Sequence, residues 1–299
     1  MDSIGFVALV VRCGQETIAS TTVFCEPPAS ATDDELERVV ELAHQLGIRV
    51  MLKPQINFSN EPDATRFRGH IGNAFRSEGE WQSWFSSYGQ LINHYASFSQ
   101  EAGVDMLCIG VELGGTTHRE EDWRRIIDEV RARFGGPITY ASLSSSGAPP
   151  PHGEEQRITW WDAVDFIGID AYYPLAGINN PNVAELKEAW ATRGYLTLLE
   201  NLSRQFDRRI ILTEFGYRSI DGAARCPGCW QNAGTLDLQE QADLYQAAFE
   251  VLWGRPWLAG IFWWQWFARP SSDSSNDADF SPYGKPAEHV LRDFYRRQP

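Results

Sequence analysis

The segment Met106-Leu107-Cys108-Ile109-Gly110-Val111-Glu112 is a short apolar run that ends in a carboxylate. A run of this kind predicts a strand covered on both faces, as in a parallel sheet between helices. Similar runs recur along the chain, and amphipathic helical patterns separate them. The predicted strands are Phe6–Val11, Ile48–Pro54, Asp105–Gly110, Ile138–Ser142, Phe166–Asp170, Ile210–Glu214 and Ala259–Trp266. This alternation predicts an α/β fold of the TIM-type (β/α) barrel.

Three sequence patterns predict where helices begin. Thr32–Glu35, Ser77–Glu80 and Thr117–Glu120 each match a capping box, in which a hydroxyl and a carboxylate bind the first backbone N–H groups of a helix. No linker rich in Pro, Gly and Ser divides the middle of the chain, and barrels commonly reach this length as one domain. We therefore expect residues 1–299 to form a single catalytic domain.

The composition restricts the class of partner. The formal net charge of -14 disfavours nucleic acid and anionic membranes as partners, because both carry negative charge. The chain has 12 Trp residues, and indole rings stack well on the C–H faces of sugar rings, which favours a neutral carbohydrate substrate. No run is long enough to span a bilayer, and the first residues lack a basic signal-peptide start. The expected location is the cytoplasm, or secretion if an upstream segment is missing.

The cysteines and histidines bear on metal binding. Cys13, Cys25 and Cys108 lie in or near strand-like segments, which predicts small buried thiols. The segment Cys226-Pro227-Gly228-Cys229 is compatible with a local disulfide, half of a zinc site or two surface thiols, and no second cysteine pair accompanies it. None of the 6 His residues ends a predicted strand, which disfavours a metal-dependent hydrolase. We expect no metal and no cofactor.

Two glutamates stand at predicted strand ends, where parallel barrels carry their active sites. Glu112 precedes Leu113 and a glycine pair, and Glu214 precedes Phe215 and one glycine. Either one alone has an ordinary alternative interpretation, a carboxylate that is solvated at a loop or paired with an Arg. Together they predict glycoside hydrolysis, which needs one carboxyl group to protonate the leaving oxygen and another to act at the anomeric carbon.

Further candidate residues lie at the same strand ends. In the last strand, alternation allows only one of Trp263 and Trp264 to face the barrel axis, and the other should pack under the outer helices. The candidate substrate-binding residues are Lys53, Gln55, Asn57, Tyr172, Tyr173, Trp263 and Trp264.

Five segments resemble one family of glycosidases. They are Val50–Pro54, Trp84–Tyr88, Ile109–Leu113, Thr213–Ser219 and Asp279–Ala287. Together they resemble glycoside hydrolase family 113, in the clan of retaining barrels that includes endo-β-1,4-mannanases, and the resemblance covers nearly the whole chain in the right order. It implies that Glu112 is the acid/base, Glu214 is the nucleophile, and β-1,4-mannan or glucomannan is the substrate.

The sequence departs from the family pattern in three places. The strand Phe6–Val11 matches the second family strand, so the first β/α unit has no counterpart and seven family-like strands remain. Gln55 replaces a His, and Arg12–Gly14 replaces an aromatic-rich turn. Val111 stands where related barrels place a polar side chain. A β-glucanase and a non-catalytic carbohydrate-binding barrel therefore remain alternatives, and an exposed strand edge favours a homodimer.

Overall fold

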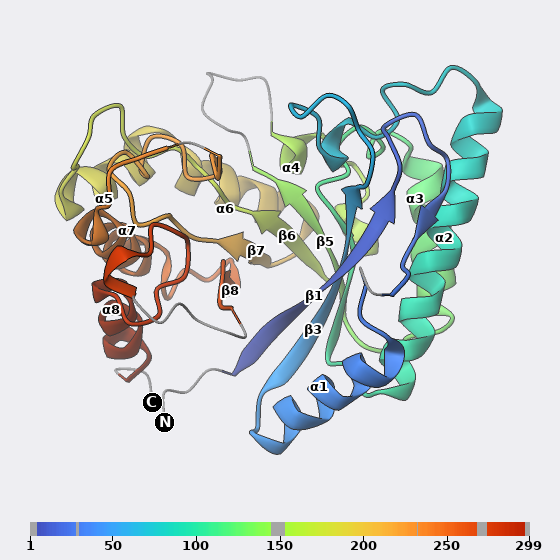
Figure 1. Ribbon diagram of the computed structural model, residues 1–299, viewed down its shortest axis with the longest axis horizontal. Coiled ribbons are helices and arrows are strands. Elements are labelled where there is room, and N and C mark those ends of the chain that lie inside the picture. The colour runs from blue at the N-terminus through green and yellow to red at the C-terminus, as the bar shows by residue number, and fades with distance from the viewer. Residues whose placement is uncertain (1–4, 28–29, 145–152, 232, 268–273, 297–299) are drawn as a thin grey trace. The chain divides into compact units, whose positions relative to one another are not determined.

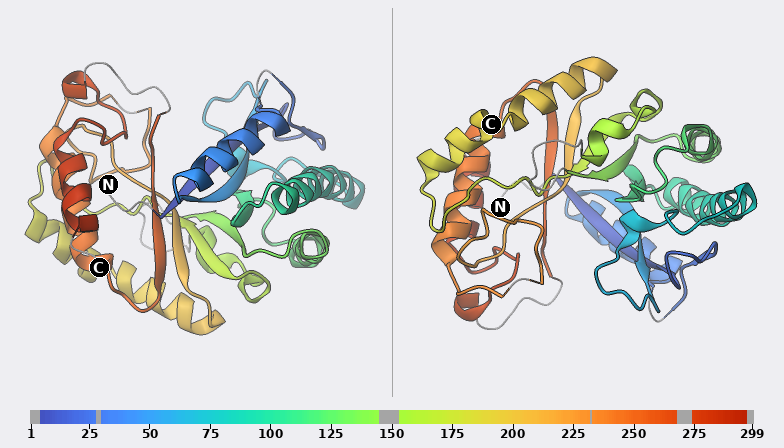
Figure 2. Two further views of the ribbon diagram at one scale, coloured as in Figure 1. Left: turned by 90° about the horizontal axis from the view of Figure 1, so that it is seen from below. Right: turned by 90° about the horizontal axis from the view of Figure 1, so that it is seen from above.

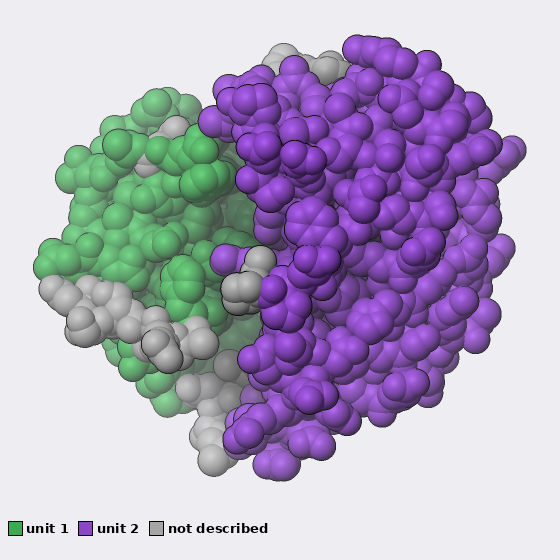
Figure 3. All heavy atoms as spheres, turned by 45° about the vertical axis from the view of Figure 1, so that its right-hand side comes forward, with its two compact units in different colours: residues 1–4, 144–153, 169–299 green, residues 5–143, 154–168 purple. Residues whose placement is uncertain are grey.

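The computed structural model describes residues 5–27, 30–144, 153–231, 233–267 and 274–296. The chain divides into two compact units (Figure 3). Unit 2 comprises residues 5–143 and 154–168, and unit 1 comprises residues 169–299 with 1–4 and 144–153. Strand β6 (Phe166–Asp170) contributes its first three residues to unit 2 and its last two to unit 1. The organisation of residues 1–299 as a single domain stays a prediction.

Unit 2 contains most of the strands, in the spatial order β2-β1-β3-β4-β5-β6. These are β1 (Phe6–Gln15), β2 (Val23–Phe24), β3 (Arg49–Phe58), β4 (Met106–Val111), β5 (Ile138–Leu143) and the start of β6. β1 pairs in parallel with β3 over its whole length, and β4 pairs in parallel with both β3 and β5. All six residues of β4 are buried, as the apolar run predicts for a strand covered on both faces.

Helices α2 and α3 lie side by side in unit 2 (Figure 1). The helices of this unit are α1 (Asp33–Gln45), α2 (Glu78–Glu101), α3 (Glu120–Arg131) and the short α4 (Glu154–Arg157), with 3-10 turns η1 (Arg68–His70) and η2 (Trp161–Ala163). Buried aromatic rings fill the space between these helices and the strands. Trp123, for example, contacts Tyr88 on α2, Tyr140 on β5 and Trp160.

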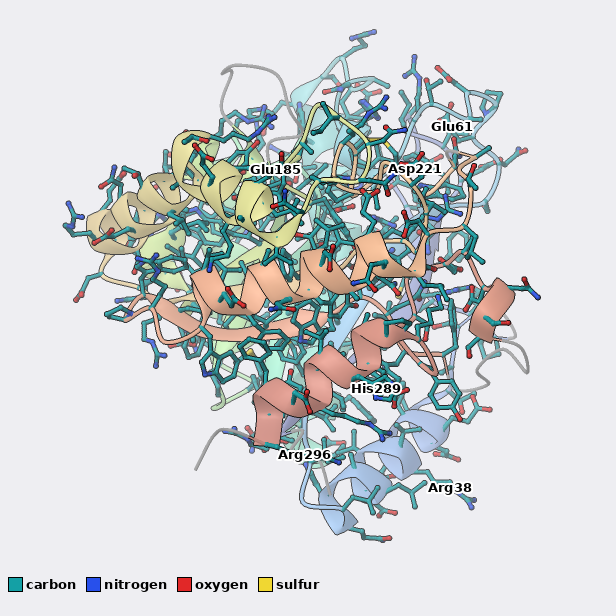
Figure 4. The ribbon with its side chains drawn as sticks, turned by 90° about the vertical axis from the view of Figure 1, so that its left-hand side faces the viewer. Arg38, Glu61, Glu185, Asp221, His289 and Arg296 are labelled. Atoms are coloured by element: carbon teal, nitrogen blue, oxygen red, sulfur yellow. A yellow bond between two sulfur atoms is a disulfide. The ribbon has the colours of Figure 1, made fainter. Side chains whose placement is uncertain are left out.

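Unit 1 contains the end of β6, then β7 (Ile210–Phe215) and β8 (Leu258–Trp263), which pair in parallel. Its helices are α5 (Val183–Thr192), α6 (Tyr195–Phe206), α7 (Leu238–Leu252) and α8 (Pro286–Arg296), with a 3-10 turn η3 (Ser274–Asn276). Helix α7 packs against both α5 and α8 (Figure 2). Figure 4 shows α7 beside α8, with His289 and Arg296 marking α8. All seven predicted strands are therefore present within a few residues of their predicted bounds.

Two of the three predicted helix starts are confirmed. Thr32 caps α1 and Ser77 caps α2, each with a reciprocal capping box. The third prediction is wrong, because α3 begins at Glu120 and its N-cap residue has no side-chain cap. Thr117 instead donates its hydroxyl to Gly114 O at 3.1 Å. The Glu120 carboxylate accepts from Arg124 at 2.8 Å, so neither half of the predicted box is available.

The prediction of separate buried thiols at Cys13 and Cys25 is also wrong, because these residues form a disulfide. Strand β2 pairs antiparallel with the end of β1, with Gly14 opposite Phe24, and this register sets Cys13 opposite Cys25. Cys226 and Cys229 form a second disulfide, which is the first of the three alternatives considered for that segment. Cys108 is a buried thiol that takes part in neither disulfide, as predicted. Within the described residues, no helix is long and apolar enough to cross a membrane.

Candidate active site

Glu112 follows β4 directly and has a backbone conformation that few residues other than glycine adopt, with φ of 50°. Two hydrogen bonds from backbone N–H groups to acceptors on β5 hold it there. The Glu112 N–H donates to Ala141 O at 2.7 Å, and the Leu113 N–H donates to the Tyr140 hydroxyl at 2.7 Å. The residue is 7% exposed, so a strained and fixed backbone presents a largely buried carboxylate at the end of the strand.

An arginine from η1 holds the Glu112 carboxylate. Arg68 Nη1 donates to Glu112 Oε2 at 2.5 Å, and the rest of the guanidinium is also engaged. Its Nε donates to Ile56 O at 2.8 Å and its Nη2 donates to Asn57 Oδ1 at 2.8 Å. The pairing with an Arg that we considered as an alternative for Glu112 is thus present. It does not argue against catalysis, because a guanidinium fixed by three acceptors can orient a reactive carboxylate.

A second carboxyl group, Glu154 on α4, lies beneath the same loop. The Tyr140 hydroxyl donates to Glu154 Oε1, and the Leu143 N–H donates to Glu154 Oε2 at 2.7 Å. The pKa of Glu154 is raised to about 8, mainly by burial and to a smaller extent by the nearby Glu112 carboxylate, against the lowering effect of its two hydrogen bonds. Glu154 is therefore protonated at neutral pH, and Tyr140 connects it to the backbone N–H next to Glu112.

The three candidates on β3 share one face of the strand, because they are two residues apart. Lys53 is completely buried, and Asn57 accepts the hydrogen bond from Arg68. The Gln55 side-chain oxygen is buried and has no hydrogen-bond partner among the described residues. This face therefore carries one acceptor that a sugar hydroxyl could satisfy.

Glu214 belongs to unit 1 and is the penultimate residue of β7, where its side chain is 7% exposed. The Tyr172 hydroxyl donates to Glu214 Oε2 at 2.8 Å, and the Ala171 N–H donates to Glu214 O at 2.7 Å. The buried Asp170, at the end of β6, accepts at 2.7 Å from the hydroxyl of Thr213. Residues following β6 thus fix both the backbone and the carboxylate of Glu214.

The aromatic candidates of unit 1 form two pairs of neighbours, Tyr172 with Tyr173 and Trp263 with Trp264. One residue of each pair packs against the helices. Tyr173 is 1% exposed and contacts Trp190 and Tyr195. Trp263 stacks on Tyr245 of α7 at 4.2 Å, and its indole N–H donates to Tyr295 of α8 at 3.0 Å. We therefore leave Tyr173 and Trp263 out of the proposed substrate-binding set.

Trp264 and Tyr172 remain in that set. Trp264 is half-buried, and its backbone N–H donates to Phe215 O at 2.8 Å, directly after Glu214. Trp263 thus packs under the helices, as strand alternation predicts for one residue of this pair, and the orientation of Trp264 towards the barrel axis stays a prediction.

The comparisons with known proteins place the chain in a family. The sequence model of Glycoside Hydrolase Family 113 matches residues 1–285. The chain belongs to glycoside hydrolase family 113. It is a glycoside hydrolase, as predicted. A comparison with curated proteins found no match.

Solved structures of family 113 are similar over nearly the whole chain. A complex of a β-1,4-mannanase is 30% identical with a TM-score of 0.85, and the match covers 98% of this chain and 88% of that one. The β-mannanase AaManA from Alicyclobacillus acidocaldarius, in complex with ManMIm, is 31% identical with a TM-score of 0.83, and the match covers 98% and 87%. A β-D-glucuronidase from Dictyoglomus thermophilum is 17% identical with a TM-score of 0.60, covering 94% and 45%, and this likeness concerns the fold alone. The α/β-barrel class is thereby confirmed.

Proposed function

We propose that this glycoside hydrolase cleaves β-1,4-mannan or glucomannan by a retaining double displacement, with Glu112 as acid/base and Glu214 as nucleophile. The observation that carries the proposal is the matched placement of the two carboxylates. Each is 7% exposed, each lies at the C-terminal end of a parallel strand, and each has a dedicated donor, Arg68 or Tyr172. The similar structures of family 113 are β-mannanases, which supports β-mannan as the substrate class.

The first step forms a bond between a Glu214 carboxylate oxygen and the anomeric carbon, while the bond from that carbon to the leaving oxygen breaks. Glu112 gives its proton to the leaving oxygen. In the second step Glu112 removes a proton from water, and the water oxygen displaces Glu214 from the anomeric carbon. Two inversions give a product with the original β configuration. The mechanism requires the two carboxyl groups to be about 5 to 5.5 Å apart.

The neighbours of the two carboxylates have different roles in this scheme. Tyr172 donates to one oxygen of Glu214 and so orients the carboxylate for attack on the anomeric carbon. Arg68 compensates the negative charge that Glu112 acquires once it has given up its proton. We expect the Gln55 oxygen to accept from a sugar hydroxyl and the Trp264 ring to stack on the C–H face of a sugar.

Azide rescue tests the two roles. The substrate is an aryl β-mannobioside with a good leaving group, which needs little protonation. Glu112→Ala should form the glycosyl-enzyme and then stall, and azide should restore turnover with a β-mannosyl azide as product. Glu214→Ala cannot form that intermediate, so azide should give the α-mannosyl azide. Product anomers are followed by NMR.

Glu78→Ala is the matched control. Glu78 also pairs with an arginine, Arg119, at 2.5 Å, but it lies on the exposed start of α2. Its removal should leave turnover unchanged. If the two azide products are exchanged between the variants, the roles of Glu112 and Glu214 are reversed. If neither variant loses activity, these residues are not the catalytic pair.

A β-glucan is the second candidate substrate, because the residues that differ from the family pattern lie beside the site. Val111 is 1% exposed and offers no polar group, and the side-chain oxygen of Gln55 has no donor within the part of the chain that the structure describes. Comparing kcat/KM on mannan, glucomannan and soluble cellulose distinguishes the candidates. A preference for mannan supports the proposal, and a preference for cellulose would replace mannan by glucan as the substrate.

A further inference from the structure

The described residues of the loop between β7 and α7, 216–231 and 233–237, line a hollow in unit 1 that the proposed catalytic scheme does not use. Its volume is about 340 Å³, and Asn179, Arg218, Asp221 and Arg225 are among the residues that line it. A volume of this size falls at the lower end of the range for small-ligand pockets, roughly 300 to 1,000 Å³. Directly after the lining residue Cys229 comes Trp230, whose side chain is 69% exposed.

Hydrogen bonds and a disulfide fix the shape of this loop. The buried Glu240 on α7 accepts from the N–H groups of Gly222 at 2.8 Å and Ala224 at 2.9 Å. The Asp221 N–H donates to Thr235 O at 2.8 Å, which ties the two sides of the loop together. The disulfide between Cys226 and Cys229 closes the turn that precedes Trp230. The hollow is therefore formed before any ligand binds, which reduces the entropy lost on binding.

The polar side chains of the hollow leave one acceptor unused. Arg225 Nη1 donates to Asn179 Oδ1 at 2.6 Å, and Asn179 Nδ2 donates to Asp221 Oδ2 at 2.8 Å. The other carboxylate oxygen of Asp221 is buried and has no hydrogen-bond partner among the described residues. A buried carboxylate oxygen without a donor is costly, and a ligand hydroxyl would supply that donor.

The loop also contacts a residue of the proposed active site. A Cβ added at Gly228 would lie 3.3 Å from Tyr172 Cβ, so the turn packs closely on that side chain. Tyr172 in turn donates to Glu214. Tyr172 therefore contacts both the loop and the proposed nucleophile Glu214, and all of these residues belong to unit 1.

We propose that the described part of this loop forms a distal binding subsite for a pyranose ring of the substrate chain. Trp230 provides a flat apolar face for the C–H surface of the ring, and Asp221 and its partners bind the hydroxyl groups. This inference rests on the proposed function for the class of ligand, a β-linked hexose chain. The subsite acts only on chains long enough to reach it, and it leaves the bond-breaking step unchanged.

The test compares long and short substrates. Trp230→Ala should lower kcat/KM on mannohexaose by roughly tenfold, the loss expected for one stacking contact, while kcat/KM on an aryl β-mannobioside stays the same. Trp230→Phe should restore most of the loss because it keeps an aromatic face. Trp253→Ala is the control, because Trp253 is another partly exposed indole of unit 1, 38% exposed, outside the loop. Equal activity of Trp230→Ala and the wild type on mannohexaose would overturn the proposal.

A binding measurement separates this inference from the proposed function. Mannohexaose is titrated calorimetrically into the wild type and Trp230→Ala, in the inactive Glu214→Gln background. If the wild type hydrolyses no mannan but the Trp230 substitution still weakens binding about tenfold, the subsite stands and the proposed function falls. If mannan is hydrolysed and binding is the same with and without Trp230, the proposed function stands and the subsite falls. Absence of both binding and hydrolysis overturns both.

Discussion

Replacing Glu154 by Gln removes a buried carboxyl group and should change how stability depends on pH. Glu154 is 4% exposed, and burial raises its pKa from 4.5 to about 8. Between these pH values the folded protein keeps a proton that the unfolded chain releases. The contribution to stability is therefore complete below the unfolded pKa of 4.5 and is lost as the pH rises through the folded pKa of about 8.

The folded and unfolded states differ by one bound proton in this pH range, and this difference sets the slope of the unfolding free energy against pH. The free energy of unfolding of the wild type should fall, relative to that of Glu154→Gln, by about 1.4 kcal/mol for each pH unit within this range. The total for a pKa raised to about 8 is roughly 3 to 6 kcal/mol. Urea denaturation at several pH values between about 5 and 8 measures it.

Glu37→Gln, on the exposed surface of α1, is the control and should give a curve parallel to that of the wild type. If the curves of the wild type and Glu154→Gln are also parallel over this range, Glu154 is ionised in the folded protein. The description of Glu154 as a protonated group beneath Glu112 would then be wrong.

Three further variants test other contacts. Tyr140→Phe leaves the Leu113 N–H without its acceptor and should lower the free energy of unfolding by about 1 to 3 kcal/mol, along with kcat; an unchanged urea midpoint would contradict this. Arg68→Lys cannot reproduce the three hydrogen bonds of the guanidinium and should lower kcat by roughly tenfold, whereas full activity would show that the ion pair is dispensable. Replacing Cys13 and Cys25 together by Ser should lower the free energy of unfolding by about 3 kcal/mol, and the reduced wild type should show a similar loss. No difference between the oxidised protein and this double variant would refute the estimate.

The strands could be predicted because each is a local pattern of apolar residues. The six buried residues of β4 are one uninterrupted run, and both faces of that strand are covered. Strand β2 has only two residues, Val23 and Phe24, which is too short for any periodicity. Its pairing with β1 is what sets Cys13 opposite Cys25, so the disulfide could not be inferred from the apolar runs.

The two proposed catalytic residues could be predicted because they terminate strands, but their neighbours could not. Arg68 lies 44 residues before Glu112, in a polar segment with no pattern that distinguishes it from other surface arginines. Glu154 belongs to a four-residue helix that shows no amphipathic period. A tyrosine inside the predicted strand Ile138–Ser142 was the one available signal, because a buried hydroxyl needs a partner. The identity of that partner depends on the tertiary fold.

The aromatic pairs show what the alternation of side chains along a strand can predict and what it cannot. It indicated that Trp263 and Trp264 face opposite ways. Which of the two packs against Tyr245 depends on where α7 and α8 lie, and that is set by contacts between residues distant in the sequence. The same applies to Tyr173, whose burial against Trp190 depends on α5.

The central claim is that a covalent intermediate forms on Glu214 during hydrolysis of a β-mannoside, and mass spectrometry of a trapped enzyme tests it most directly. The reagent is a 2-deoxy-2-fluoro-β-mannobiosyl fluoride, in which fluorine slows both steps and the good leaving group favours the first. We predict that the intact mass rises by one fluorinated disaccharide, and that the labelled proteolytic peptide contains Glu214. A label on another residue, or release of the inverted α product with no labelled protein at any time, would contradict the account.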